Sequence, residues 1–186
     1  MKSINLTNQF LIAMPGLSDQ SFHQTVSYIF SHNEHGAMGI VINRPLKMGL
    51  GEIFEQMQLT SNISGTDKIP VFDGGPVKTD RGFILHKPNA KWQSSIKVSE
   101  SIEVTTSKDI LEAISNGTGP SKQFIALGYA GWEEGQLEQE MLENCWLTTP
   151  ATPDIIFDIP ANMRWECAAS SLGINMHNLS LQAGHA

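Results

Sequence analysis

The sequence contains few of the features that mark specialised classes of protein. Only two of its 186 residues are cysteines, Cys145 and Cys167, so no disulfide framework is expected and a reducing cytoplasm is the default compartment. No apolar run is long enough to span a bilayer. The apolar segment 10–14 is too short for the core of an export signal, and Pro15 follows it without a cleavage pattern. We therefore expect a soluble, cytoplasmic protein.

Positive charge is also scarce. The chain has 12 Lys and Arg against 19 Asp and Glu, which gives a formal net charge of −7. Non-specific binding to nucleic acid depends on basic side chains that displace counterions, and the pair Arg44 and Lys47 is too small to form a basic patch. Zinc-finger spacings, basic helices and RNA-binding aromatic motifs are missing as well. The composition therefore argues against contact with DNA.

Motifs for covalent catalysis and for metal binding are not found. The sequence has no G-x-S-x-G, and neither cysteine has a histidine close to it in the chain. His32 and His35, with His23 nearby, could share a zinc ion, but a third defined ligand is lacking. We interpret these histidines as residues of a surface turn, and we predict neither a metal nor a cofactor.

A glycine-rich segment, GYAGWEEG at 128–135, follows an apolar run and opens a helical pattern. Its spacing fits neither the dinucleotide-binding pattern nor the P-loop, and Glu133 and Glu134 would repel a phosphate. We interpret the glycines as positions at which a strand packs closely against a helix.

The features that are present are typical of one globular domain. Hydrophobic residues make up 40% of the chain and charged residues 17%. A chain of this length can bury roughly 70% of the surface that its unfolded form exposes. Because no linker, repeat or low-complexity segment divides the sequence, we predict a single domain over residues 1–186.

The clearest local prediction is a β-hairpin within Thr25–Pro45. Two apolar runs, Val26–Phe30 and Met38–Ile42, flank a polar connector that ends in Gly36. Other strands are expected at Gln9–Met14, Pro70–Phe72, Gly82–His86, within Ser94–Val104, Gln123–Tyr129, Cys145–Thr148 and Ile155–Asp158.

Helices are expected at about Leu50–Gln58, from a capping box at Thr106 to Gly117, after Gly135, and after Pro160. In the helix after Gly135, we predict that Leu137, Met141 and Leu142 face the interior and that the glutamates face solvent. Pro45–Gly51 interrupts the strand pattern, and fraying is expected beyond Ile174.

The turn Asp73–Pro76, with the sequence DGGP, is the best candidate for a site. Successive glycines can direct backbone amides toward an anion, and Asp73 with Arg44 and Arg81 could hold a polar ligand. In the alternative, Asp73 caps amides of a tight turn and the arginines make structural pairs. We predict that the end of the hairpin lies beside this turn. The candidate ligand-binding residues are Asn43, Arg44, Asp73, Gly74, Gly75 and Arg81.

Four separated motifs together resemble the YqgE/AlgH family of bacterial proteins. They are FLIAMPGLSD, HNEHGAMGIVINRPL, FDGGPV with DRGFILH, and ALGYAGWEEGQLEQEMLENCWLTTPA with the terminal AGHA. The resemblance covers nearly the whole chain in order. It implies a cytosolic α+β protein of one domain, with a complex, bifurcated mixed sheet that forms a pseudo-barrel with flanking helices. It also implies the label of transcriptional regulator that this family carries.

Three functions are compatible with the sequence. We favour a non-enzymatic regulatory protein that binds a small ligand or a protein partner at the surface formed by Asn43, Arg44 and Asp73–Pro76. The second is an enzyme for a small anionic substrate, with Asp73 as acid or base and Arg44 or Arg81 as clamp. The third is a DNA-binding regulator, against which the net charge argues.

Overall fold

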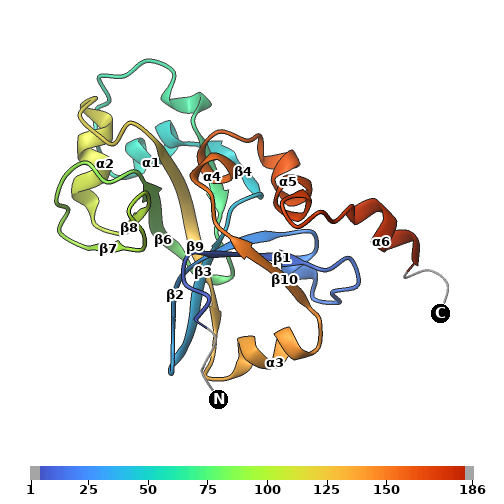
Figure 1. Ribbon diagram of the computed structural model, residues 1–186. Helices are drawn as coiled ribbons and strands as arrows, with labels where there is room; N and C mark the ends of the chain where they lie inside the picture. The colour runs from blue at the N-terminus through green and yellow to red at the C-terminus, as the bar shows by residue number, and fades with distance from the viewer. Residues whose placement is uncertain (1–4, 183–186) are drawn as a thin grey trace.

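The computed structural model describes residues 5–182, so the terminal AGHA motif at 183–186 lies outside the described residues. Strands in this part of the chain form one curled sheet in the order β10-β1-β2-β3-β9-β6-β8-β7, while β4 pairs with β5 and β5 pairs with β9 (Figure 1). The strands are β1 (Gln9–Ala13), β2 (Val26–Asn33), β3 (Gly36–Val41), β4 (Pro45–Gly49), β5 (Pro70–Asp73), β6 (Val77–His86), β7 (Ser95–Lys97), β8 (Glu103–Thr105), β9 (Gln123–Trp132) and β10 (Trp146–Pro150).

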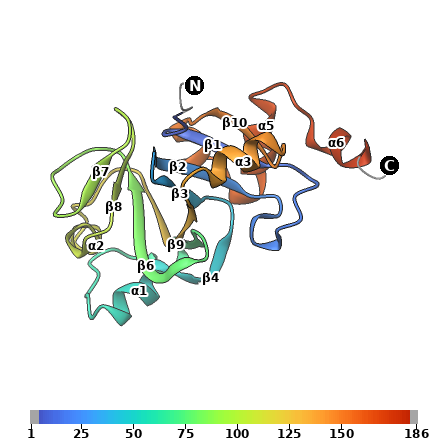
Figure 2. The same ribbon diagram turned by 90° about the horizontal axis from the view of Figure 1, so that it is seen from below.

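Helices lie on both sides of this sheet (Figures 1 and 2). α1 and α2 lie at one end, near β6 and β8, and α3 lies at the opposite end in Figure 1. The helices are α1 (Leu50–Gln56), α2 (Lys108–Ser115), α3 (Gln136–Leu142), α4 (Pro153–Phe157), α5 (Arg164–Ser170) and α6 (Met176–Gln182), with short 3-10 turns η1 (Gln20–Phe22), η2 (Thr66–Lys68) and η3 (Ala161–Met163). Within the described residues, no helix is both long and apolar enough to cross a membrane.

The predicted hairpin is present and is longer than the apolar runs indicated. β2 and β3 pair antiparallel from Ser27 opposite Val41 to Asn33 opposite Gly36, so only Glu34 and His35 form the turn. Gly36 has φ 121° and an added Cβ would lie 2.1 Å from the carbonyl oxygen of Trp132. The turn needs glycine because the hairpin packs closely against another strand here.

Strand β9 is the branch point of the sheet. Its first half pairs antiparallel with β6 and parallel with β5, whereas Ala130–Trp132 pairs with β3. Between the two halves lies Gly128, whose φ of 75° is in the left-handed region that favours glycine. The sheet is therefore mixed and bifurcated, and the predicted α+β class is confirmed.

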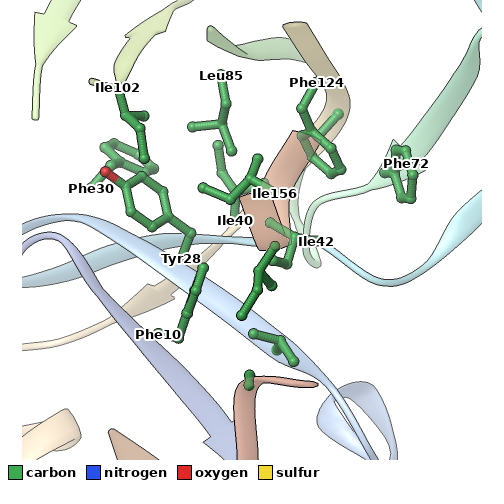
Figure 3. Close-up of a cluster of buried hydrophobic side chains, with 14 of the residues drawn as sticks. Phe10, Tyr28, Phe30, Ile40, Ile42, Phe72, Leu85, Ile102, Phe124 and Ile156 are labelled. Atoms are coloured by element: carbon green, nitrogen blue, oxygen red, sulfur yellow. The ribbon is translucent and has the colours of Figure 1, made fainter. Parts of the chain in front are cut away.

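The largest core cluster lies between the sheet and the helices α4 and α5 (Figure 3). Phe72 and Phe124 stack with ring centroids 4.3 Å apart, and Phe10 meets Tyr28 edge to face. Burial raises the pKa of the Tyr28 phenol, whose hydroxyl donates to Asn8 Oδ1. Two smaller clusters lie under α3 and under the pair α1 and α2. Cys145 and Cys167 are free thiols.

Several local predictions are wrong. Pro45–Gly49 forms strand β4 rather than a break, since its partner β5 supplies a ladder that the local pattern does not reveal. The predicted strand Ile155–Asp158 falls largely in helix α4, because Pro153 sits at its first turn and favours a helix start. Fraying is predicted beyond Ile174, but Met176–Gln182 form helix α6, while residues 183–186 lie outside the described part of the chain.

The start of α2 and the buried face of α3 also differ from the predictions. Helix α2 has Ser107 rather than Thr106 at its N-cap, and Ser107 Oγ donates to the Asp109 carboxylate. In α3, Leu137 is buried, but Leu142 is 77% exposed, because a spacing of five residues turns it by about 140° away from the face that carries Leu137.

Candidate functional site

The end of the hairpin does lie beside the Asp73 turn. The Asp73 amide donates to the carbonyl oxygen of Arg44 at 2.8 Å, and the Val41 amide donates to that of Gly74 at 2.9 Å. Pro45 also pairs with Phe72 in the β4–β5 ladder. The two backbones are therefore in direct contact, as the sequence predicted.

The side chains at the end of the hairpin point into the protein's own loops. Arg44 donates from Nη1 to the carbonyl of Ser21 and from Nη2 to those of Gln20 and His23, at 3.3 and 3.1 Å. Asn43 Oδ1 accepts from the Val26 amide at 2.9 Å, and its Nδ2 donates to the Gln24 carbonyl. Both side chains fasten the 20–26 segment to the end of β3.

The Asp73 turn offers no amide to an anion. The Gly75 amide donates to Asp73 Oδ1 at 3.1 Å, and the Gly74 amide donates to the Leu127 carbonyl at 2.8 Å. An added Cβ on Gly75 would lie 2.3 Å from the carbonyl carbon of Tyr129. The glycines allow this turn to pack against β9, which is the structural alternative that the sequence left open.

Arg81 lies apart from Arg44. Its Nη2 donates to Thr106 Oγ1 at 3.2 Å, and its guanidinium lies 5.7 Å from the centroid of the Phe83 ring. Arg81 and Arg44 line different hollows, and Asp73 lines neither of these two. The structure therefore separates the carboxylate and the two cations that were expected to share a ligand.

A buried cation that the sequence interpretation missed lies next to the turn. Arg164 is 6% exposed, donates to the carbonyls of Ile159 and Ile42, and lies over the rings of Phe72 and Phe124 at 5.1 and 5.4 Å. Burial lowers its pKa to about 10. It forms no ion pair with a carboxylate of the described residues. Its two carbonyl acceptors make it a structural clamp.

The histidine interpretation needs one correction. His32 is buried rather than at a surface turn, and its Nδ1 accepts from the Leu6 amide at 3.0 Å. Its Nε2 therefore carries the hydrogen and donates to Glu138 Oε1 at 2.9 Å, whereas His35 is exposed. Among the residues that the structure describes, no three His, Cys, Asp or Glu side chains are placed to hold a metal ion.

The acidic helix α3 also differs from its predicted solvent-facing role. Glu140 Oε2 accepts from the indole nitrogens of Trp132 and Trp146, at 2.9 and 2.8 Å. With Glu138 bound to His32, two of its glutamates fasten the helix to the sheet. The two nearby tryptophans were the available signal, because a buried indole N–H needs an acceptor.

The hollow that contains Arg81 is lined by different types of residue from the region around Arg44 and Asp73. It encloses about 440 Å³ between α1, β6, β9 and the start of α2, and we call it the α1–α2 hollow. Its floor is apolar and includes Ile53, Ile84, Leu111, Ile125 and Leu127, while its rim carries Gln56, Asp80, Arg81, Thr106, Ser107 and Lys108. A second hollow of about 630 Å³ is lined by Asn43, Arg44 and Trp165 among others, and the polar atoms of these three side chains already bind the protein.

A family model and several related sequences place the chain in the same protein family. Residues 10–177 match the family model described as AlgH-like. The chain belongs to the AlgH-like family. It is 55% identical over 184 residues to a UPF0301 protein of Thioalkalivibrio sulfidiphilus, covering 99% of this chain and 98% of that one. It is 52% identical over 188 residues to a UPF0301 protein of Vibrio vulnificus, with coverages of 98% and 100%.

Two solved structures share the AlgH-like fold. The solution structure of the AlgH protein from Pseudomonas aeruginosa is 49% identical, with a TM-score of 0.82 over 100% of this chain and 98% of that one. A protein from Corynebacterium diphtheriae is 16% identical, with a TM-score of 0.75 and coverages of 97% and 94%, and it supports the fold alone. In this AlgH-like protein, the α1–α2 hollow combines an apolar floor with cationic rim groups, which suits an anion that carries an apolar part.

Proposed function

We propose that this AlgH-like protein is a non-enzymatic, cytosolic regulatory protein that binds a small amphipathic anion in the α1–α2 hollow. The ligand class is a carboxylate or similar anion with a short apolar chain. The observation that carries the proposal is the apolar floor of the hollow beneath a rim that holds Arg81 and Lys108. Apolar surface provides binding free energy, and the few charged groups at the rim fix the orientation of the ligand.

The rim charges are only weakly engaged within the protein. Lys108 Nζ lies 3.6 Å from Glu112 Oε1, and both side chains are about half exposed. Arg81 is exposed and donates to one hydroxyl, that of Thr106. Since exposed ion pairs contribute little to stability, binding an anion would displace no strong internal contact. Asp80 leaves the rim with a small positive balance.

The other two functions have less support. An enzyme built on Asp73 needs a free carboxylate near a cationic clamp, but Asp73 caps its own turn and the two arginines line separate hollows. Direct DNA binding needs a basic surface, and the net charge is −7.

Titration calorimetry with decanoate tests the proposed function. We expect saturable binding that weakens about tenfold in Arg81→Gln and in Lys108→Gln, because each change removes one charge-assisted contact. Lys97→Gln is the matched control. Lys97 is a similarly exposed lysine on β7 that pairs with Glu100, and it does not line the hollow. Decanol, which has the same chain without the charge, should bind more weakly than decanoate. Equal binding of the two ligands, or equal losses in the control, would contradict the proposal.

A further inference from the structure

A buried histidine at the end of β6 is connected to the surface by two hydroxyl groups. His86 is fully buried, and its Nδ1 lies 2.9 Å from the carbonyl oxygen of Lys87. A carbonyl oxygen only accepts hydrogen bonds, so Nδ1 carries the hydrogen of the neutral ring. The other nitrogen, Nε2, is therefore the acceptor.

The direction of the remaining bonds follows from this tautomer. Thr105 Oγ1 lies 2.8 Å from His86 Nε2 and must donate to it. Ser95 Oγ lies 2.7 Å from Thr105 Oγ1, whose hydrogen is already used, so Ser95 donates to Thr105. Thr105 is buried, whereas Ser95 is exposed on the edge strand β7. The chain of hydrogen bonds thus leads from a surface hydroxyl to a buried neutral base.

We propose that Ser95 Oγ is a nucleophile that accepts an acyl group from an activated ester or thioester. Thr105 relays the proton of Ser95, and His86 receives the proton that Thr105 releases. An oriented hydroxyl and a base in hydrogen-bond reach are the two parts that nucleophilic catalysis requires. The transfer is a single acylation of the protein itself without turnover, so it is compatible with a non-enzymatic protein. None of these three side chains lines the α1–α2 hollow, so the acylation and the proposed anion binding can fail independently.

The transfer balances without a further reagent. The Ser95 Oγ–acyl bond forms as the bond between the acyl carbon and the leaving group breaks, and the leaving group departs with the electron pair. The Ser95 proton passes to Thr105 Oγ1 while the Thr105 proton passes to His86 Nε2. The Lys87 carbonyl accepts from Nδ1 and stabilises the imidazolium. Because His86 is fully buried, the imidazolium returns a proton through Thr105 Oγ1 to the departing oxygen or sulfur of the leaving group beside Ser95.

The surroundings of His86 keep the ring neutral at neutral pH. Burial lowers the pKa of His86 from its usual 6.5, while the Lys87 carbonyl and the charge of Glu103 oppose that change. Glu103 is the register partner of His86 on β8, and Trp92 meets the ring edge to face at 6.3 Å. The base is therefore available at pH 7, and acylation should decline only at a pH below the usual titration range of histidine, because the pKa of His86 is lowered.

A neighbouring row of hydroxyls supplies a matched control. Ser94 Oγ lies 3.0 Å from Thr106 Oγ1, which accepts from Arg81 Nη2 at 3.2 Å. The two rows have similar spacing on adjacent residues, but this one ends on a guanidinium, which cannot accept a proton. Ser94 should therefore stay unmodified under conditions that acylate Ser95.

Incubation of the full chain with p-nitrophenyl acetate, followed by peptide mass spectrometry, tests the proposal. We expect a burst of p-nitrophenolate and one acetyl group on Ser95, lost in Ser95→Ala and kept in Ser94→Ala. His86→Gln preserves an acceptor for Thr105 but removes the base, and it should slow acetylation about a hundredfold and abolish its decline at acid pH. Thr105→Val should behave similarly, and Thr105→Ser should restore the rate.

Three results would overturn this inference. The first is the absence of any acetyl group on Ser95. The second is acetylation spread equally over lysines and over Ser94, which would indicate only general surface reactivity. The third is an unchanged rate and pH profile in His86→Gln, since that variant keeps the hydrogen bond and loses only the proton acceptor.

Discussion

Two regions of the molecule contain the same types of residue but use them differently. One is the junction at which the β4–β5 pair meets β9, and the other is the α1–α2 hollow. At the junction, Arg44 and Arg164 donate to backbone carbonyls, and the Gly74 and Gly75 amides are bound within the protein. At the hollow, Arg81 makes one hydrogen bond to a hydroxyl and lies beside an apolar floor. Arginine and glycine therefore indicate a binding site only where their polar groups are left for a ligand. At the junction they hold the fold together.

The sharpest way to test the structural role of the junction is Gly75→Ala. Gly75 has φ 146°, and its Cβ would lie 2.3–2.4 Å from backbone atoms of the central strand β9. Backbone in β9 cannot move without disturbing the ladders on both sides, so we expect a loss of at least about 4 kcal/mol in the free energy of unfolding, or no folding. Urea denaturation of the variant and of the unchanged protein measures this loss in the free energy of unfolding.

Gly65→Ala is the matched control for that change. Gly65 also has a left-handed φ, 78°, but its Cβ would meet nothing within 4 Å. The substitution should cost only about 1 kcal/mol, the strain of a non-glycine residue in this conformation. Equal losses in the two variants would show that backbone strain, rather than contact with β9, explains the need for glycine at position 75.

The comparison also explains what the sequence could and could not predict. The hairpin and the buried β9 followed from apolar periodicity and turn residues, which are local signals. The proximity of Arg44 to Asp73 followed instead from polar and glycine residues gathered at the ends of strands. β4 was missed because its strand character depends on pairing with β5, far along the chain. The separation of Arg44 from Arg81 depends on side-chain direction at a bulged register of β6, which no local pattern encodes.

Missed residues share a second physical cause. Glu138, Glu140 and Arg164 are charged, so composition places them at the surface. Glu138 binds His32 and Arg164 binds the Ile42 carbonyl, both far along the chain, whereas the two tryptophans that bind Glu140 lie on the strands that flank its own helix. Ser95, Thr105 and His86 were missed because their hydrogen-bond chain forms only when β6, β7 and β8 pair. Burial and partners of polar groups are properties of the assembled sheet.

Arg164→Met is expected to have the second largest effect. Methionine keeps much of the contact with Phe72 and Phe124 but leaves the carbonyls of Ile42 and Ile159 without this donor. We expect a loss of about 3 kcal/mol, since each buried acceptor left unsatisfied is costly. Arg164→Lys should recover little of it, because an ammonium lacks the planar fork that reaches both carbonyls. Near-neutral stability in Arg164→Met would remove the clamp role from this residue.

A smaller loss is expected for Arg44→Ala. Its guanidinium is only partly buried, so water can replace some of the hydrogen bonds to the carbonyls of Gln20, Ser21 and His23. We expect a loss of about 1–2 kcal/mol by thermal or urea denaturation. Hydrogen exchange should also quicken in the 20–26 segment. If stability were unchanged and decanoate binding were lost instead, Arg44 would belong to a ligand site after all.

Arg81→Ala should have the smallest effect on stability and the largest on binding. Arg81 is exposed, and its contacts are one hydroxyl and the Phe83 ring, so the expected change in unfolding free energy is within about 0.5 kcal/mol. Arg44→Ala is its matched partner, with the charge change identical and the expected outcomes reversed. Stability falls and decanoate affinity holds in Arg44→Ala, whereas affinity falls and stability holds in Arg81→Ala. Similar outcomes in both variants would break the distinction between the junction and the hollow, because that distinction rests on which arginine still has hydrogen-bond donors to offer.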